Sequence, residues 1–294
     1  MICLTVIAMT ACRSGQDQTT AADAGPGEAA LPADIPAVYQ PEDVEILEHC
    51  LGELAPYRKE PVGQLVARAG MMFLNTSYVS HTLEREEEVL VVNLRELDCT
   101  TFAEYCLAIA RTVQHRNPSF PNFLEELQLI RYRDGQLEAY PSRLHYFCDW
   151  IYDNAEKGVV KECAAGMGGE PLSKEIHFMS SNPQNYTQIM GDSALIAIIQ
   201  DQERAINQRN LYYIPENLVG ETANLLETGD IVGITTDVDG LAVMHVGILV
   251  SINGEIHLLH ASSAAGKVLI SEETLEGYLS ESKRATGIMV ARPI

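Results

Sequence analysis

Residues 96–113 read ELDCTTFAEYCLAIARTV, and they predict the helix around which the rest of the chain is organised. Asp98 stands at the position of a helix N-cap, so the helix is predicted to begin at Cys99. The apolar residues that follow recur at spacings of three and four, which is the pattern of one buried helix face. This face consists of Phe102, Tyr105, Cys106, Ile109, Ala110 and Val113.

Cys99 falls in the first turn of the predicted helix. Unpaired N–H groups and the positive end of the helix dipole favour an anion there, which predicts a lowered thiol pKa and a nucleophilic role. The alternative is that Cys99 is one more buried apolar residue, as most lone cysteines are. Cys106, in mid-helix, fits that alternative well.

A hairpin is predicted near the C-terminus, where residues 243–250 (VMHVGILV) and 255–260 (EIHLLH) flank Asn253 and Gly254. Asn-Gly between two apolar runs is the strongest short-range signal for a two-residue hairpin turn. The turn sets the register of the two strands, and a longer loop or a bulge would change it.

The register brings two histidines together. Gly247 faces His260, and because side chains alternate between the faces of a strand, His245 shares a face with His260. His257 points to the other face and is predicted to have a structural or solvent role. A thiol at a helix start with two histidines on one sheet face indicates a cysteine hydrolase, with Cys99 as the nucleophile. The alternative is that the histidines are ordinary polar residues of a hairpin.

Three short motifs resemble those of the NlpC-type, papain-like cysteine cell-wall hydrolases. They are Asp98–Phe102 (DCTTF), His245–Val250 (HVGILV) and Leu258–Ser263 (LLHASS). From about Pro61 to the C-terminus, the chain resembles one branch of that superfamily, the N-acetylmuramoyl-L-alanine amidase-like family of Bacteroides-type bacteria. The supporting segments are Ser77–Glu84, Val91–Phe102, Ser142–Ile151 and Gly229–Ile248. One departure is the segment 75–77, Asn-Thr-Ser, where the family tends to have a Gly-Thr-Pro turn.

The resemblance implies an α+β fold with a papain-like core, in which N-terminal helices and the catalytic helix pack on an antiparallel β-sheet. In the resulting hypothesis Cys99 attacks a carbonyl, His245 is the general base and then the general acid, and His260 orients the His245 ring. The resemblance also implies that Tyr78 lies beside the nucleophile and polarises the substrate carbonyl, a packed core tyrosine being the alternative. The implied bond is the amide between N-acetylmuramic acid and the L-alanine of the stem peptide.

Residues 117–210 are predicted to be an insertion that shapes the substrate pocket. Segments 130–132 and 136–139 predict a hairpin, and Ser142 is predicted to cap a helix that continues through Asp153. Four side chains of that helix are candidates for a sugar-binding platform, namely Arg143, His145, Tyr146 and Trp150. A tryptophan is nevertheless more often a core residue.

Other elements complete the predicted α+β layers. Helices are predicted over 44–54, 62–74 and 272–280, and strands over 230–236, 242–251, 255–261, 267–270 and 286–292. The chain has 294 residues and a net charge of −21 without a basic cluster, which argues against binding to nucleic acid or to an anionic membrane surface.

The N-terminal residues resemble a lipoprotein signal. The apolar segment 1–11 is too short to span a bilayer, and Met9-Thr10-Ala11-Cys12 resembles a bacterial lipobox, although the positively charged region of ordinary signals is absent. The predicted organisation is a signal at 1–12, a flexible linker at 13–40 and one catalytic domain at 41–294. The predicted location is the cell envelope, periplasmic and lipid-anchored through Cys12.

Cofactors are not predicted, and the predicted partners are muropeptides. The chain has seven cysteines, and four remain when the signal cysteine, Cys12 and Cys99 are set aside. In an exported protein, disulfides among these four are permitted but not required. Three alternative functions stay open. They are a γ-D-glutamyl–diaminopimelate endopeptidase of the same superfamily, a zinc amidase using His245, His257 and His260, and a tethered muropeptide-binding lipoprotein without turnover. Preference for the anhydro form of the sugar and the oligomeric state are left open.

Overall fold

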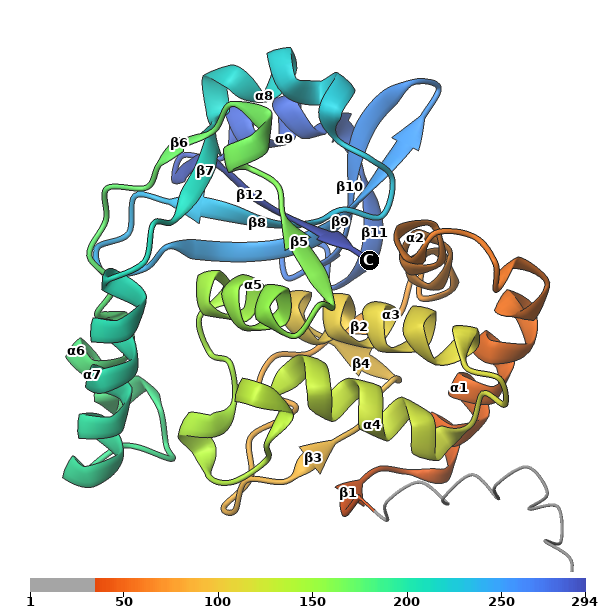
Figure 1. Ribbon diagram of the computed structural model, residues 1–294, viewed down its shortest axis with the longest axis horizontal. Helices are drawn as coiled ribbons and strands as arrows, with labels where there is room; N and C mark the ends of the chain where they lie inside the picture. The colour runs from red at the N-terminus through yellow and green to blue at the C-terminus, as the bar shows by residue number, and fades with distance from the viewer. Residues whose placement is uncertain (1–34) are drawn as a thin grey trace, which may run out of the picture. The chain divides into compact units, whose positions relative to one another are not determined.

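The computed structural model describes residues 35–294 (Figure 1). The predicted signal, its lipobox with Cys12 and most of the predicted linker lie outside the described residues. The end of the predicted linker already belongs to the fold, because β1 (Ala37–Val38) pairs in parallel with β3 (Leu90–Val91).

Two helices precede the central one, as the sequence predicts. They are α1 (Pro41–Leu54) and α2 (Val62–Met72), separated by a short 3-10 helix at Ala55–Tyr57. Helix α2 approaches the sheet closely at Gly70, where an added Cβ would lie 2.8 Å from Leu259 Cδ2. A glycine at this point therefore allows the helix to pack directly on the strands.

Helix α3 (Cys99–Gln114) begins where the sequence predicts. The Asp98 carboxylate accepts hydrogen bonds from the backbone N–H groups of Thr100 at 3.1 Å and Thr101 at 2.8 Å. The Asp98 N–H in turn donates to the Thr101 hydroxyl, which completes a reciprocal cap. The six residues of the predicted apolar face are all fully buried. The N-cap thus sets where this helix begins, and the apolar periodicity sets which of its faces is buried.

A long, mostly antiparallel sheet provides the second layer, with the strand order β4-β2-β11-β10-β9-β8-β12-β7-β6 and with β5 paired to β12. Its strands are β2 (Ser77–Tyr78), β4 (Glu96–Leu97), β5 (Val160–Glu162), β6 (Glu170–Pro171), β7 (Tyr212–Pro215), β8 (Ile231–Thr236), β9 (Val243–Ile252), β10 (Glu255–Ser262), β11 (Lys267–Thr274) and β12 (Ala285–Pro293). The five predicted C-terminal strands correspond to β8 to β12. The predicted α+β class is therefore confirmed.

Helices cover both faces of this sheet (Figure 1). One buried cluster joins α1 to α5 to the sheet through residues such as Val246 and Ile248. A second cluster joins α8 (Glu216–Thr222) and α9 (Leu275–Glu281) to the other side through Leu249 and Leu258. Consecutive strand residues thus belong to different clusters. This is expected because side chains alternate between the two faces of a strand, and both faces of this sheet are buried.

The inserted region differs from its prediction in two places. Helix α4 (Phe120–Arg131) continues through the first predicted hairpin strand, and a 3-10 turn at Arg133–Gly135 follows it, so the predicted hairpin is wrong. Helix α5 spans Phe147–Glu156 and is preceded by a 3-10 turn at Tyr140–Ser142, so Ser142 does not cap it. The remaining helical segments are Ala165–Met167, α6 (Phe178–Ser181), Pro183–Asn185, α7 (Ser193–Asn207) and Ala223–Leu225.

Within residues 35–294, none of the helices has both the length and the apolar character needed to cross a bilayer.

Candidate active site

Cys99 follows β4 directly and occupies the first position of α3. The residue is half-buried, and its sulfur lies beside the backbone of Val246, the residue after His245, which favours the thiolate form. All five cysteines within residues 35–294 are free thiols, and the other four are buried: Cys50, Cys106, Cys148 and Cys163. Cys99 is therefore the most accessible thiol in the described part of the chain.

The two histidines meet as the predicted register requires. The strands pair Glu255 with Ile252 at the turn and continue in register to Leu259 and Ile248. His245 Nε2 and His260 Nδ1 lie 2.7 Å apart, with the two rings nearly perpendicular at 85°. A register shift between β8 and β9 near His245 leaves the hairpin register intact.

Gly247 makes room for this histidine pair. A Cβ at this position would lie 2.6 Å from Leu258 Cδ1 and 3.2 Å from His260 Cβ, and both distances are shorter than ordinary contacts. The absence of a side chain at Gly247 therefore lets His260 stand beside β9, within reach of His245.

The hydrogen bond between the rings links their proton positions, because one ring nitrogen must donate and the other must accept. If His245 carries its proton on Nε2 and donates it to His260 Nδ1, then His245 Nδ1 is left as a proton acceptor. Burial, reinforced by the second ring, lowers the pKa of His245 from 6.5 to about 3, and burial lowers the pKa of His260 to about 4. Both imidazoles are thus neutral at neutral pH.

The prediction of a lowered thiol pKa for Cys99 is wrong. Burial is the larger cause and the charge of Asp98 the next, and together they raise the pKa of the Cys99 thiol to about 11. The nearby Val246 backbone lowers the thiol pKa but is outweighed. The prediction relied on the positive helix terminus to lower the thiol pKa. The negative charge of the Asp98 carboxylate, which caps α3, acts against that effect.

Two tyrosines lie close to the sulfur. Tyr78, on β2, is half-buried, and burial together with the nearby Cys99 and Asp98 raises its pKa. Tyr278, on α9, packs edge-to-face against His260 with ring centroids 5.3 Å apart. Burial and the nearby Cys99 raise the pKa of Tyr278. No sequence pattern singles out Tyr278, because its spacing from Leu275 marks it only as part of an apolar helix face.

The turn before Tyr78 keeps a glycine-like backbone although it lacks the expected glycine. Asn75 has φ 69°, in the left-handed region that asparagine tolerates better than most residues. Its N–H donates to the carbonyl of Val268 at 2.9 Å, and Lys267 Nζ donates to its side chain at 2.8 Å. The departure from the Gly-Thr-Pro turn is thereby accommodated next to β11.

Arg143 and Trp150 are interior residues. Arg143 is paired with Glu84 at 3.0 Å and Glu88 at 2.9 Å. Trp150 is 1% exposed and stacks on Phe147 with ring centroids 5.1 Å apart. Their burial contradicts the prediction that they belong to an accessible sugar platform.

His145 and Tyr146 also serve the packing of the inserted region. His145 Nε2 donates to the Tyr140 carbonyl at 2.9 Å, and burial lowers the pKa of His145 to about 3. The Tyr146 hydroxyl donates to Glu203 at 2.7 Å and accepts from the Met179 N–H. These bonds join the inserted segments to one another, and of the four predicted platform residues only His145 keeps partial exposure.

His257 does not join the other two histidines. It is buried, and its Nδ1 donates to the Ser271 carbonyl at 3.1 Å, which confirms the predicted structural role. Within residues 35–294, no three His, Cys, Asp or Glu side chains converge as a set of metal ligands.

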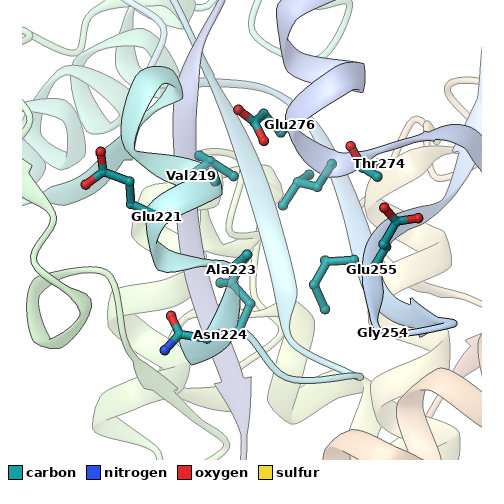
Figure 2. Close-up of a pocket in the computed structure, with 12 residues that line it drawn as sticks. Val219, Glu221, Ala223, Asn224, Gly254, Glu255, Thr274 and Glu276 are labelled. Atoms are coloured by element: carbon teal, nitrogen blue, oxygen red, sulfur yellow. The ribbon is translucent and has the colours of Figure 1, made fainter.

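A cleft of about 660 Å³ lies away from the histidine pair, between α8, the β9–β10 turn and the start of α9 (Figure 2). Buried Val219 and Leu275 form part of its wall, and Glu221, Glu255 and Glu276 line it. None of the predicted site residues contributes to it.

Comparisons with known proteins identify the relatives of this chain. The family described as N-acetylmuramoyl-L-alanine amidase-like (AmiA-like) matches residues 68–288. The crystal structure of an N-acetylmuramoyl-L-alanine amidase from Bacteroides uniformis is similar, with 36% identity and a TM-score of 0.75, over 79% of this chain and 99% of that one. No curated protein sequence matches the chain.

Two further solved structures are similar. A Bacteroides fragilis protein with the provisional name of a xylanase shares 37% identity over 76% of this chain and 98% of its own, with a TM-score of 0.72. A Legionella pneumophila protein at 19% identity, with a TM-score of 0.63 over 86% of this chain and 97% of its own, shows likeness of fold alone.

A thiol and two paired imidazoles on a mixed α and β scaffold are typical of a hydrolase. The matched residues cover most of the chain. The chain belongs to the N-acetylmuramoyl-L-alanine amidase-like family, a family of amidase-like peptidoglycan hydrolases.

Proposed function

We propose that this protein is a cysteine amidase that hydrolyses the bond between N-acetylmuramic acid and the L-alanine of the stem peptide in peptidoglycan fragments. The observation that carries the proposal is the 2.7 Å hydrogen bond between His245 and His260, beside the helix that begins at Cys99. Family membership supports the amide bond and the peptidoglycan substrate.

The protonation states of Cys99 and His245 before substrate attack determine the first step of the proposed reaction. With a raised thiol pKa and a lowered imidazole pKa, Cys99 and His245 are both neutral. His245 Nδ1 therefore takes the thiol proton while Sγ attacks the lactyl carbonyl, and the carbonyl electron pair moves to oxygen. His260 stabilises the resulting imidazolium by accepting the His245 Nε2 proton in a hydrogen bond.

The intermediate then collapses in two stages. The C–N bond breaks as His245 gives its proton to the L-alanine amine, which leaves the muramoyl half on Cys99 as a thioester. Water next attacks the thioester, His245 takes a water proton, and the C–S bond breaks with return of that proton to sulfur. The backbone N–H of Cys99 and the Tyr78 hydroxyl are the proposed donors to the oxyanion.

The rival peptidase uses the same side chains on a different bond. A γ-D-glutamyl–diaminopimelate endopeptidase would release a piece that contains diaminopimelate. The muramoyl amidase would instead release the whole stem peptide with a free L-alanine amine. The name of the Bacteroides uniformis relative favours the second outcome.

The provisional xylanase name of one relative raises a glycosidase as another candidate. Glycoside hydrolysis ordinarily needs two carboxyl groups that flank the bond. The carboxylate next to the sulfur, that of Asp98, is engaged in capping α3. The site chemistry therefore favours amide hydrolysis.

Product identification tests the proposal. N-acetylmuramoyl-L-alanyl-D-glutamate is incubated with the parent protein, and mass spectrometry is expected to find N-acetylmuramic acid and L-alanyl-D-glutamate. Cys99→Ala is expected to lower kcat by about 10⁴-fold or more. Cys106→Ala, a cysteine change on the same helix, should keep the activity. Intact substrate with the parent, in the presence of measurable binding, would indicate a binding module instead.

The papain-like core and the domain organisation remain part of the proposal. A helix that begins at a cysteine and packs on an antiparallel sheet with the histidines supports a core of the NlpC type. We further propose a signal at 1–12, a linker that ends before β1, and one catalytic domain with an insertion at about 117–210.

The proposed location is the periplasm, with attachment to a membrane through lipidated Cys12. The support is the lipobox-like sequence alone. Cells that express the full chain should give detergent-phase protein, and Cys12→Ala should move it to the aqueous phase. An unchanged distribution would contradict the anchor.

A further inference from the structure

We propose that Tyr278 is a positioning residue, whose ring holds the imidazole of His260 in the orientation that accepts the hydrogen bond from His245. The proposal rests on the proposed function, because it assigns Tyr278 a part in the same reaction. It concerns the ring of Tyr278 rather than its hydroxyl group.

His260 is fixed by hydrogen bonding at only one of its two nitrogens. Its Nδ1 is engaged by His245 at 2.7 Å. Among residues 35–294, no side chain or carbonyl forms a hydrogen bond with its Nε2. The ring turns about its side-chain torsions, which a single hydrogen bond restrains only in part, so the orientation of His260 also depends on what packs against it.

Tyr278 supplies that packing. Its ring stands 5.3 Å from the His260 ring at 80°, which is the edge-to-face arrangement that aromatic rings favour. On the other side of His260, the His245 ring lies at 4.9 Å and 85°. His260 is only 2% exposed between these two neighbours.

Helix α9 holds Tyr278 rigidly. Thr274 caps the helix by accepting a hydrogen bond from the Gly277 N–H at 3.3 Å. Leu275 and Leu279 are fully buried one turn apart, and Tyr278 lies on the same side of the helix as both. The position of the ring is thus set by an anchored helix that directly follows β11 in the sequence.

Two substitutions separate the ring from the hydroxyl. Tyr278→Phe retains the edge-to-face ring and is expected to keep kcat within about twofold of the parent. Tyr278→Leu removes the ring and is expected to lower kcat by about 10- to 100-fold with little change in KM, because orientation of the base contributes to the chemical step.

The pKa of His260 distinguishes a positioning role of Tyr278 from a purely structural one, because a loss of stability alone would not change it. Burial holds the pKa of His260 at about 4, well below 6.5. Tyr278→Leu admits water to the ring, so the pKa of His260 should rise toward 6.5. The acidic limb of kcat/KM should move to higher pH in parallel.

Tyr212→Leu is the matched control. Tyr212 packs against the same buried cluster as Tyr278, but on β7 and away from His260. Its loss should lower the melting temperature to a similar extent without changing kcat or the pH profile.

The experiment combines turnover of the defined muramoyl dipeptide with NMR titration of the His260 ring in the parent, Tyr278→Phe, Tyr278→Leu and Tyr212→Leu. A raised His260 pKa and a lowered kcat in Tyr278→Leu alone support the proposal. An unchanged titration and kcat in Tyr278→Leu, or an equal loss in Tyr278→Phe, overturn it. Absence of turnover in the parent defeats the proposed function instead, and the titration still decides the role of Tyr278.

Discussion

At the scale of single residues, the site is a neutral thiol beside neutral imidazoles. The Asp98 carboxylate makes α3 begin at Cys99, and the same charge raises the thiol pKa. A residue that is needed for the local fold therefore works against a resting thiolate. Cleavage then depends on proton transfer to His245 during attack rather than on a preformed ion pair.

Asp98→Asn should separate these two effects. Asparagine caps a helix about as well as aspartate, so α3 should stay in place, while loss of the charge should lower the pKa of the Cys99 thiol. The rate of Cys99 alkylation by iodoacetamide, followed by peptide mapping across a pH series, should shift to lower pH. Asp192→Asn makes the same change at the cap of α7 and should leave the profile unchanged. An unshifted profile in Asp98→Asn would contradict the assigned cause.

The buried histidines should make the protein sensitive to acid. The folded pKa values of His245 and His260 lie below 6.5, so the unfolded chain binds more protons as the pH falls from 6.5 to about 4. The free energy of unfolding should be fully retained above pH 6.5. It should decrease below that pH by up to about 1.4 kcal/mol per pH unit for each histidine.

Urea unfolding between pH 4 and 8 measures this dependence. His260→Gln should give a shallower decrease than the parent, because one of the suppressed protonation sites is gone. His49→Gln, at an exposed position on α1, should keep the parental slope. Equal slopes in the parent and in His260→Gln would contradict the linkage.

At the scale of secondary structure elements, the β9–β10 hairpin and α3 carry the site. Both could be predicted because their signals are local: Asn253 and Gly254 set the strand register, and Asp98 sets the helix start. The contribution of α9 could not be predicted in this way. Tyr278 reaches His260 only because the strands place α9 beside β10, and that arrangement depends on the whole sheet.

Gly247→Val should show how closely the hairpin is packed. Its Cβ would stand 2.6 Å from Leu258 and 3.2 Å from His260, so the free energy of unfolding should fall by about 1–3 kcal/mol. Displacement of His260 should also lower kcat. Gly52→Ala on α1, where an added Cβ meets nothing within 4 Å, should be neutral or stabilise by about 0.5–1 kcal/mol. Parental stability and activity in Gly247→Val would contradict the packing argument.

At the scale of the whole described molecule, a buried ion pair joins the inserted region to the central helix. Arg131 of α4 bonds to Glu104 of α3 at 2.7 Å, and both side chains are at most 3% exposed. Arg131 also donates to the Val91 carbonyl of β3 at 2.7 Å. Three segments distant in sequence thus meet at one guanidinium group.

Arg131→Met should lower the free energy of unfolding by about 3–5 kcal/mol, because it leaves the Glu104 charge buried without a partner. Glu60→Gln removes the more exposed pair with Arg68 and should change stability by about 1 kcal/mol or less. Denaturant unfolding of both variants measures the contrast. Equal effects would show that the buried pair does not anchor α4.

The inserted region was the part least open to prediction. The turn at residues 133–135 resembles a hairpin turn in composition, yet the chain before it is helical because Leu127 and Ile130 are buried on α4. Arg143 reads as a ligand-binding residue on its own, whereas its partners Glu84 and Glu88 lie more than fifty residues away. Such long-range pairing leaves no local trace in the sequence.

The most direct test of the central claim is to capture the acyl group during turnover. Hydroxylamine is added to the parent protein and N-acetylmuramoyl-L-alanyl-D-glutamate, and the products are identified by mass spectrometry. A thioester on Cys99 predicts N-acetylmuramoyl hydroxamate together with released L-alanyl-D-glutamate, and neither product with Cys99→Ala. Cleavage of the same amide without hydroxamate, or at an undiminished rate in Cys99→Ala, would contradict the account.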